Sequence, residues 1–174
     1  SVAEAYLLED ESFKATAMNA EITQYSSHQT RGLGFRAVLN GRMGYAATEA
    51  FDEAAIGQLI RGALDSATYC EDDSEQLIYE GREPAAVLPL TGEDAPAEQK
   101  LAFALAMESA AKAYDARITQ VGYDTVLSGR VKVRIVNTHG MDKHYEQTIC
   151  GAYLQPIARE GELTATGMEI QFSR

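Results

Sequence analysis

The sequence of 174 residues has no tryptophan, four prolines and two cysteines. Cys70 and Cys150 are too few for the disulfide framework of a small secreted domain, so we expect two reduced thiols in a cytoplasmic protein. No stretch approaches the ~20 apolar residues of a membrane-spanning helix. The first residues also lack the basic region and apolar run of a signal peptide. We therefore expect no membrane partner.

Basic residues are scarce as well. Lysine and arginine total 15 against 26 aspartates and glutamates, which gives a net charge of −11. A nucleic-acid backbone repels such a chain unless a local basic patch exists. The densest group of cations, Arg130, Lys132 and Arg134, alternates along an expected strand and forms no patch. Nucleic acid is thus a poor partner.

The remaining composition is that of a globular protein, with 45% apolar and 24% charged residues. A chain of this length buries roughly 70% of its unfolded surface, which is enough for a core without metal or disulfides. We expect a single domain over residues 1–174. Residues 71–95 are acidic and contain Pro84, Pro89 and Gly92, which predicts an internal surface connection.

Alternating apolar residues predict strands through the first fifty residues. The clearest signal is a pair of alternating runs, 33–39 and 43–47, on either side of Asn40-Gly41. Both turn residues accept the positive φ of a type I′ turn, so this pattern predicts a β-hairpin.

Two amphipathic helices should follow, at about 52–69 and 96–114. Asp52 suits the N-cap of the first helix, and Pro96 suits the first helical position of the second. The apolar stripe of the first helix consists of Ile56, Leu59, Ile60, Ala63, Leu64 and Ala67. The inner face expected for the second helix consists of Leu101, Ala104, Leu105, Met107 and Ala111.

The strand period returns after Ala116. We expect a strand around Val131–Ile135, a turn at 137–140, and two further strands at 145–154 and 163–172. Short connections join antiparallel neighbours. The order of elements therefore predicts an α+β fold with a largely antiparallel sheet, two main helices, and β-rich segments before and after them.

Two motifs suggest ligand chemistry. Residues 32–37 fit G-x-G-x-x-A, but a dinucleotide fingerprint must open a helix, whereas this segment runs into the expected hairpin. His139, Asp142, His144 and Glu146 have metal-ligand chemistry, with His139 and His144 as the candidates for a metal or hydrolytic site. A solvated turn that leads into a strand explains the same residues.

Other catalytic signals are weak. Ser27 and His28 are neighbours on an expected strand and should point to opposite faces. Cys150 lies among apolar strand residues, which favours a buried and inert thiol. The acidic run 71–75 lacks the ligand spacing of a calcium loop. The residues alone define no catalytic site and no cofactor site.

An ordered set of segments nevertheless resembles a known family. These segments are Arg31-Gly32-Leu33-Gly34-Phe35-Arg36, Asn40-Gly41-Arg42-Met43-Gly44-Tyr45-Ala46-Ala47-Thr48, the helix at 51–69, Asp115-Ala116-Arg117-Ile118, and Val133-Arg134-Ile135-Val136-Asn137-Thr138-His139-Gly140-Met141. In this order they resemble the N-terminal half of the PmbA/TldD family, and the second of the two later landmarks, residues 133–141, favours its PmbA branch, also called TldE, over TldD.

The resemblance implies part of a two-subunit zinc metallopeptidase, once described as a modulator of DNA gyrase, that acts in proteolysis and peptide maturation. The family's zinc motif, H-E-x-x-x-D, lies in the C-terminal part of the TldD subunit. No histidine of this sequence precedes a glutamate, so no zinc position can be carried over. The resemblance then implies a non-catalytic N-terminal domain with an assembly or substrate-chamber role. Its expected partners are its own C-terminal domain, a TldD-like subunit that holds the zinc, and unstructured peptides.

On this hypothesis, a set of turn and packing residues has a structural role: Gly32, Gly34, Asn40, Gly41, Gly44, Asn137 and Gly140. Two alternatives stay open, namely a stand-alone protein-binding α+β module and an independent hydrolase around His139 and His144. A homodimer formed through strand edges or an apolar helix face is a further expectation.

Overall fold

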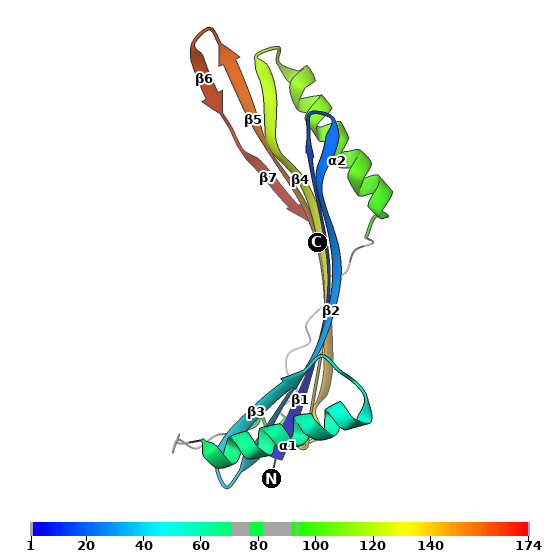
Figure 1. The fold of residues 1–174 in the computed structure, drawn as a ribbon, viewed down its shortest axis with the longest axis vertical. Helices are drawn as coiled ribbons and strands as arrows, with labels where there is room; N and C mark the ends of the chain where they lie inside the picture. Colours follow the sequence, from blue (N-terminus) through cyan, green and yellow to red (C-terminus); the bar gives the residue numbers. More distant parts are fainter. Residues whose placement is uncertain (1, 71–76, 82–91, 93, 174) are drawn as a thin grey trace. The chain divides into compact units, whose positions relative to one another are not determined.

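The computed structural model describes residues 2–70, 77–81, 92 and 94–173 (Figure 1). In this part of the chain, two helices accompany a mostly antiparallel sheet of seven strands, which confirms the expected α+β class. The strand order is β3-β2-β1-β4-β5-β6, and β7 also pairs with β5. The elements are β1 (Val2–Met18), β2 (Glu21–Leu39), β3 (Arg42–Thr48), α1 (Glu53–Tyr69), α2 (Ala97–Tyr114), β4 (Ile118–Asn137), β5 (Asp142–Glu160), β6 (Leu163–Thr166) and β7 (Glu169–Ser173).

The connection expected at 71–95 lies largely outside the described residues. Its described parts, 77–81, 92 and 94–95, form neither helix nor strand. Ile78 is nevertheless buried, and the Tyr79 carbonyl accepts a hydrogen bond from the side-chain amide of Asn137 at 3.0 Å. Neither described helix is long and apolar enough to cross a bilayer.

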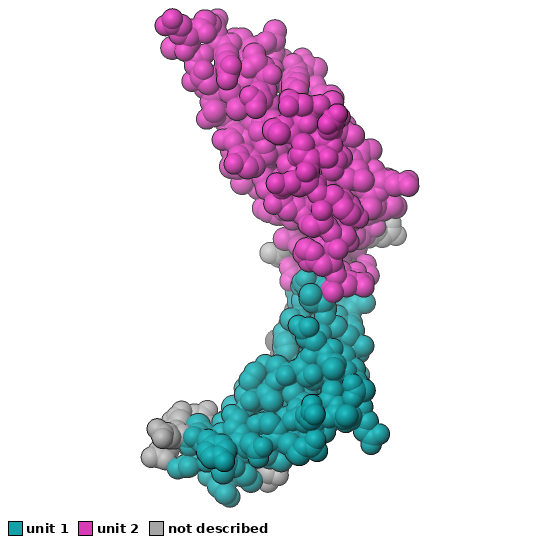
Figure 2. Space-filling model, in the orientation of Figure 1, with its two compact units in different colours: residues 1–10, 30–89, 131–146 teal, residues 11–29, 90–130, 147–174 magenta. Residues whose placement is uncertain are grey.

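The chain divides into two compact units, which we call unit 1 (residues 1–10, 30–89 and 131–146) and unit 2 (residues 11–29, 90–130 and 147–174) (Figure 2). Four long strands, β1, β2, β4 and β5, contribute residues to both units. Each unit has one helix, α1 in unit 1 and α2 in unit 2.

Unit 1 contains the hairpin predicted from the sequence. Strands β2 and β3 pair antiparallel from Leu33↔Thr48 to Leu39↔Arg42. Between them, Asn40 and Gly41 both have positive φ, at 53° and 80°. Two successive positive φ values define a type I′ turn, so both the turn and its register are confirmed.

Replacing Gly41 by valine should destabilise the chain by about 1–2 kcal/mol, because a β-branched residue is strained at a φ of 80°. Nothing else lies within 4 Å of the added Cβ, so the effect would come from the backbone alone. Thermal unfolding measures it, and Gly41→Asn serves as the matched control because asparagine tolerates this region. A valine variant as stable as the asparagine variant would contradict the turn assignment.

Helix α1 covers β3 in unit 1 (Figure 1). The Asp52 carboxylate accepts a hydrogen bond from the Ala55 amide at 2.9 Å, which confirms Asp52 as the N-cap. Leu59, Ala63 and Ala67 form its buried stripe, one helical turn apart from one another. Because two of these three residues are alanines, the helix backbone lies close to the sheet, and Ala63 and Ala67 are the nearest neighbours of Gly44 in β3.

Unit 2 packs α2 against the strands through small residues. Ala104 of α2, Ala17 of β1 and Val126 of β4 form its buried cluster, with Leu105, Met107 and Ala152 among the half-buried neighbours. The helix begins one residue later than expected. Pro96 is its N-cap and not its first helical residue, because its ψ of 149° is extended and its carbonyl accepts the first helical bonds.

The final segment, expected to be one strand over 163–172, consists of the two strands β6 and β7. Both pair with β5 in the same antiparallel register, from Glu160↔Leu163 to Cys150↔Ser173. That register places Pro156 opposite Gly167, where the strand is interrupted. Proline has no N–H to donate to the ladder, and only the Gly167 amide bonds to the Pro156 carbonyl, at 3.1 Å. The interruption is thus explained by the missing N–H of Pro156 on the paired strand.

Candidate functional site

The buried side of α2 is the most unusual feature of unit 2, because it contains two charged residues. Lys100, Ala104 and Glu108 are spaced four residues apart and form the fully buried stripe of the helix. The sequence predicted a different and wholly apolar face. Of that face only Ala104 is buried, since Leu101, Leu105, Met107 and Ala111 are half-buried.

Lys100 lies at the N-terminal end of this stripe with its side chain only 9% exposed. Its ammonium group donates to the Asp94 carboxylate at 2.6 Å and to the Ser128 hydroxyl at 2.7 Å. It also lies 4.5 Å from the centre of the Phe13 ring. Burial of a lysine is costly unless its charge is compensated, and here a carboxylate, a hydroxyl and an aromatic face compensate it.

The Lys100–Ser128 distance invites comparison with serine–lysine catalytic pairs. In such a pair a neutral lysine accepts the proton of the serine nucleophile. An ammonium group that donates to Asp94 and lies over the Phe13 ring has no free lone pair for that proton. In this structure Lys100 is the donor and the Ser128 hydroxyl the acceptor of their hydrogen bond, which ties α2 to β4.

Two cavities of unit 2 meet at Lys100 and Ser128. One is a groove of about 540 Å³ between α2 and strands β4, β5 and β7. The other, of about 530 Å³, lies against the N-terminal end of α2 and is lined by polar residues that include Ser27 and His28. Ser27 and His28, the adjacent serine and histidine noted in the sequence, both line this second cavity.

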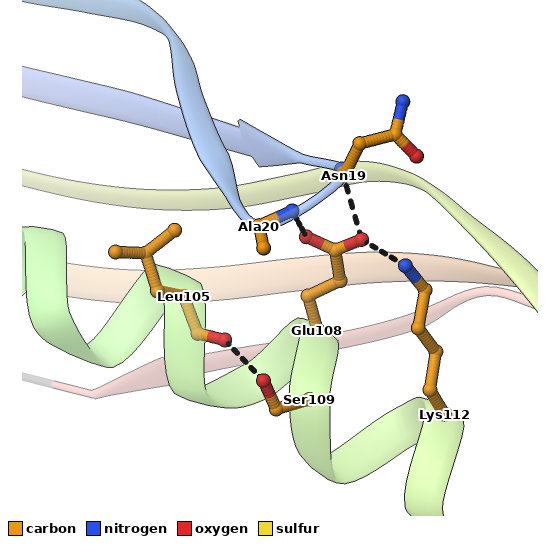
Figure 3. A network of polar contacts seen from close by, with 6 residues as sticks. All are labelled: Asn19, Ala20, Leu105, Glu108, Ser109 and Lys112. Carbon is orange, nitrogen blue, oxygen red and sulfur yellow. Dashed lines mark hydrogen bonds and ion pairs between the residues drawn. The ribbon is translucent and has the colours of Figure 1, made fainter.

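Glu108 lies at the other end of the stripe and holds the turn between β1 and β2 (Figure 3). Its two carboxylate oxygens accept the backbone amides of Asn19 at 2.9 Å and Ala20 at 2.8 Å, and one of them also accepts from Lys112. Asn19 and Ala20 have φ values of 56° and 62°. Alanine is strained in this region, so the buried carboxylate stabilises a turn that local sequence disfavours.

Burial would raise the pKa of Glu108, but hydrogen bonds from Lys112, Ala20 and Asn19 outweigh burial and lower the pKa below its usual value. Glu108 is therefore charged in the folded chain. Its contribution to stability is present above its ordinary pKa and is lost as the pH falls through the lowered value.

Asp124 of β4 is a second buried carboxyl close to Glu108. The residue is fully buried, and neither of its carboxyl oxygens has a hydrogen-bond partner within the described residues. Burial first, and then the nearby Glu108 charge, raise the pKa of Asp124 to about 7. The backbone of Glu108 lowers this pKa, but less than these two causes raise it. Asp124 is thus neutral in slightly acidic solution.

The candidate metal ligands of the sequence lie in unit 1. Asn137 accepts the amides of His139 and Met141, which makes 137–140 the expected turn, with a φ of 92° at Gly140. Both oxygens of Asp142 accept from Arg134, at 2.9 and 2.7 Å. His144 and Glu146 line a small cavity of about 190 Å³ that His139 does not reach.

Within the described ranges, no three or more histidine, cysteine, aspartate or glutamate side chains are grouped to hold a metal ion. The acidic run 71–75 lies outside the described residues.

The glycine-rich segment 32–37 lies within β2 and continues into the hairpin, not into a helix, so it lacks the helix N-terminus that a dinucleotide needs. Two arginines at this segment are paired inside unit 1: Arg31, just before it, with Glu9 at 3.1 Å, and Arg36, within it, with Glu4 at 2.6 Å. The ring of Tyr45 lies over Gly34, whereas Gly32 has neither a positive φ nor a neighbour that a Cβ would meet. The structure thus shows no conformational need for glycine at position 32.

Both cysteines are free thiols. The expectation that Cys150 is buried is wrong, because this residue is exposed and lines the groove beside α2. Apolar neighbours along a strand do not bury a residue when its face of the sheet borders an open groove. Cys70, at the C-terminal end of α1, is half-buried.

Two family models match the chain in succession. Domain 1 of the PmbA/TldA metallopeptidases matches residues 3–67, and the central domain of the same metallopeptidases matches residues 91–173. The chain belongs to the PmbA/TldD family. A search of curated protein sequences gives no match.

Three solved structures share the fold of this PmbA/TldD-family chain. A candidate modulator of DNA gyrase from Thermotoga maritima has a TM-score of 0.87 at 18% identity, and one from Bacteroides thetaiotaomicron has 0.81 at 19%. TldE from Thermococcus kodakarensis has 0.74 at 14%. The alignments cover 99%, 99% and 100% of this chain but only 39%, 41% and 40% of those chains, respectively. The chain thus spans about two fifths of the length of these relatives.

Proposed function

We propose that the chain forms the N-terminal, non-catalytic part of a TldE-like subunit in a cytoplasmic zinc metallopeptidase that acts in proteolysis and peptide maturation. The observation that carries this proposal is the succession of two PmbA/TldD-family domains over nearly the whole chain. The likeness of the whole chain to two fifths of TldE supports it. The zinc would reside in a TldD-like partner.

The sheet face of unit 2 that lies opposite α2 supports an assembly role. Ala152 packs toward α2, and side chains alternate along a strand, so Ile149 and Gly151 of β5 lie on the opposite face. The Phe172 side chain of β7 lies over Gly151, and Ile170 shares its face. Ile149, Ile170 and Phe172 are 38%, 48% and 57% exposed. Neighbouring apolar side chains left in water favour a surface that another part of the complex covers.

The chemistry of the described residues fits a scaffold better than a catalyst. Lys100 donates to Asp94 and Ser128, and Glu108 is bound by three donors. Each of these buried charges joins α2 to a strand or to the turn between strands. In the proposed complex, these contacts would keep the wall of the substrate chamber rigid.

Assembly can be tested with the complete subunit that contains this chain, co-expressed with its TldD-like subunit. The variant Ile170→Glu/Phe172→Glu places two charges on the apolar face and should reduce recovery of the complex at least about tenfold. Tyr114→Glu, at the 87% exposed end of α2, is the matched control and should assemble normally.

The melting temperature of each isolated variant shows whether the double variant still folds. A folded double variant that assembles as well as the control would contradict the assembly role. If the double variant does not fold, the single change Phe172→Ser tests the same face with a smaller perturbation.

A further inference from the structure

Two carboxyl groups lie close together between α2 and the sheet of unit 2. Glu108 of the helix is 2% exposed, and Asp124 of β4 is fully buried. Val126, two residues further along β4, packs against Ala104 of α2, so the alternation of a strand places Asp124 on the face that α2 covers. One buried contact thus contains two groups that can each carry a negative charge.

The hydrogen-bond donors at this contact bind Glu108 and not Asp124. The Glu108 carboxylate accepts the backbone amides of Asn19 at 2.9 Å and Ala20 at 2.8 Å, and it also accepts from Lys112 (Figure 3). Both carboxyl oxygens of Asp124 are buried, and neither has a hydrogen-bond partner among the described residues. A neutral carboxyl group tolerates such a place far better than a carboxylate, because an unpaired buried charge is the more costly of the two.

The elements around Asp124 bring no further charge to it in the described part of the chain. Asp124 is the one charged residue of β4 between residues 118 and 129, and β5 has no charged residue between 147 and 158. On α2, Lys112 pairs with Glu108, and Lys100 pairs with Asp94 two helical turns away. The nearest charged or titratable side chains of the remaining strands are exposed: Lys14 of β1, Glu21 and His28 of β2, and Glu169 of β7.

Backbone strain lies on both sides of the contact. Asn19 and Ala20 have φ values of 56° and 62°, and Tyr123, the residue before Asp124, has a φ of 53°. Such values are costly for residues other than glycine, and they persist only where neighbouring contacts hold them. The Glu108 carboxylate is the side chain that holds the turn at 19–20. A second charge beside Glu108 would therefore act first on this turn.

We propose that Glu108 and Asp124 form a pH-sensitive latch, by which α2 holds the turn between β1 and β2. While Asp124 keeps its proton, Glu108 carries the one negative charge of the pair and binds both amides of the turn. When Asp124 gives its proton to solvent, two buried carboxylates face the single ammonium group of Lys112, and the turn is released more often. The latch lies within unit 2 and does not depend on the proposed function.

The direction of the pH effect follows from proton binding. Burial first, and then the charge of Glu108, raise the pKa of Asp124 to about 7 in the closed latch, whereas an aspartate exposed by opening has its ordinary pKa near 3.8. Between these values opening releases a proton, so a rise in pH favours the open latch. Above about pH 7 both forms are ionised, and the effect levels off.

Amide exchange of the 174-residue chain, followed by NMR from about pH 5 to about pH 8 and corrected for the intrinsic exchange rate, tests the latch. The amides of Asn19 and Ala20 report its opening. The Met141 amide in unit 1 is the internal control, because the neutral side chain of Asn137 holds it. Asp124→Asn removes the titration, and Asp65→Asn makes the same change on the exposed side of α1.

We expect the protection of Asn19 and Ala20 to fall at least about tenfold between about pH 5 and pH 7 and then to level off. The protection of Met141 should change less than about twofold. The fall should disappear in Asp124→Asn and persist in Asp65→Asn.

Constant protection of Asn19 and Ala20 over this range would overturn the proposal. An equal fall at Met141 would also overturn it, because the whole chain would then loosen and not this turn. A fall that persists in Asp124→Asn would assign the effect to another group. If that variant does not fold, the carboxyl carbon signal of Asp124 in the parent chain replaces it, and a titration complete below about pH 5 would contradict the latch.

Discussion

Replacing Gly44 by alanine should destabilise the chain by about 3 kcal/mol, the largest effect that we expect from adding a single methyl group. An ideal Cβ at position 44 would overlap the carbonyl oxygen of Ala63 and the backbone of Ala67 in α1. Both neighbours are helix backbone, which cannot turn aside as a flexible side chain can. The helix would have to move away from β3 and expose part of its buried stripe.

Urea unfolding of the Gly44→Ala variant measures this loss. Gly32→Ala is the matched control, because it adds the same methyl group to the neighbouring strand with nothing within 4 Å and no positive φ. We expect its free energy of unfolding to stay within about 0.5 kcal/mol of the parent value. Equal stabilities of the two variants would show that the backbone of α1 does not lie in close contact with Gly44 of β3.

The parent chain should lose about 2–4 kcal/mol of its free energy of unfolding through Asp124 as the pH rises from about 4 to 8, and Asp124→Asn should remove this loss. The folded chain holds the proton of Asp124 up to about pH 7, whereas an ordinary aspartate loses it near 3.8. Between these values the folded state binds more protons than the unfolded state, so its stability falls as the pH rises. Asparagine is neutral throughout and removes this loss.

The measurement is the difference in free energy of unfolding between Asp124→Asn and the parent, followed from about pH 4 to pH 8. The difference should shift in favour of the variant as the pH rises. In a Glu108→Gln background the shift should be smaller, because the Glu108 charge contributes to the raised pKa of Asp124. A difference that stays constant over this pH range would contradict a neutral Asp124 in the folded chain.

The features that the sequence predicts correctly are those with local causes. The turn at Asn40-Gly41 follows from the φ preferences of two adjacent residues, and the start of α1 follows from the Asp52 side chain. The helical period of α1 is visible because its buried residues, Leu59, Ala63 and Ala67, recur at a spacing of four residues. Each of these signals is complete within a short window of sequence.

The features that the sequence misses depend on contacts between distant segments. Lys100 and Glu108 are buried because Ser128 and the backbone of residues 19–20 supply their partners. The sequence of α2 alone does not include those partners, so hydropathy predicts that both charged side chains are exposed to solvent. The Lys-x₇-Glu spacing on one helical face was a usable signal for a buried polar stripe, though one that solvated helices also show.

At residues 163–172 the sequence predicts one feature correctly and misses another, because the second depends on a contact with a different strand. Alternation predicts strand correctly over 163–172, but the interruption at Gly167 comes from Pro156 on the paired strand. The exposure of Cys150 likewise depends on the groove that α2 and β7 form around it. The family resemblance rests on the ordered motifs, and the two matched domains confirm it.

The most direct test of the central claim is a peptidase assay of the purified 174-residue chain with an unstructured peptide and added zinc, together with its metal content. We expect no zinc-dependent cleavage and no stoichiometric zinc in the isolated chain, and cleavage only when the complete subunit meets its TldD-like partner. Zinc-dependent cleavage by the isolated chain that survives repurification and disappears in His144→Ala would contradict it.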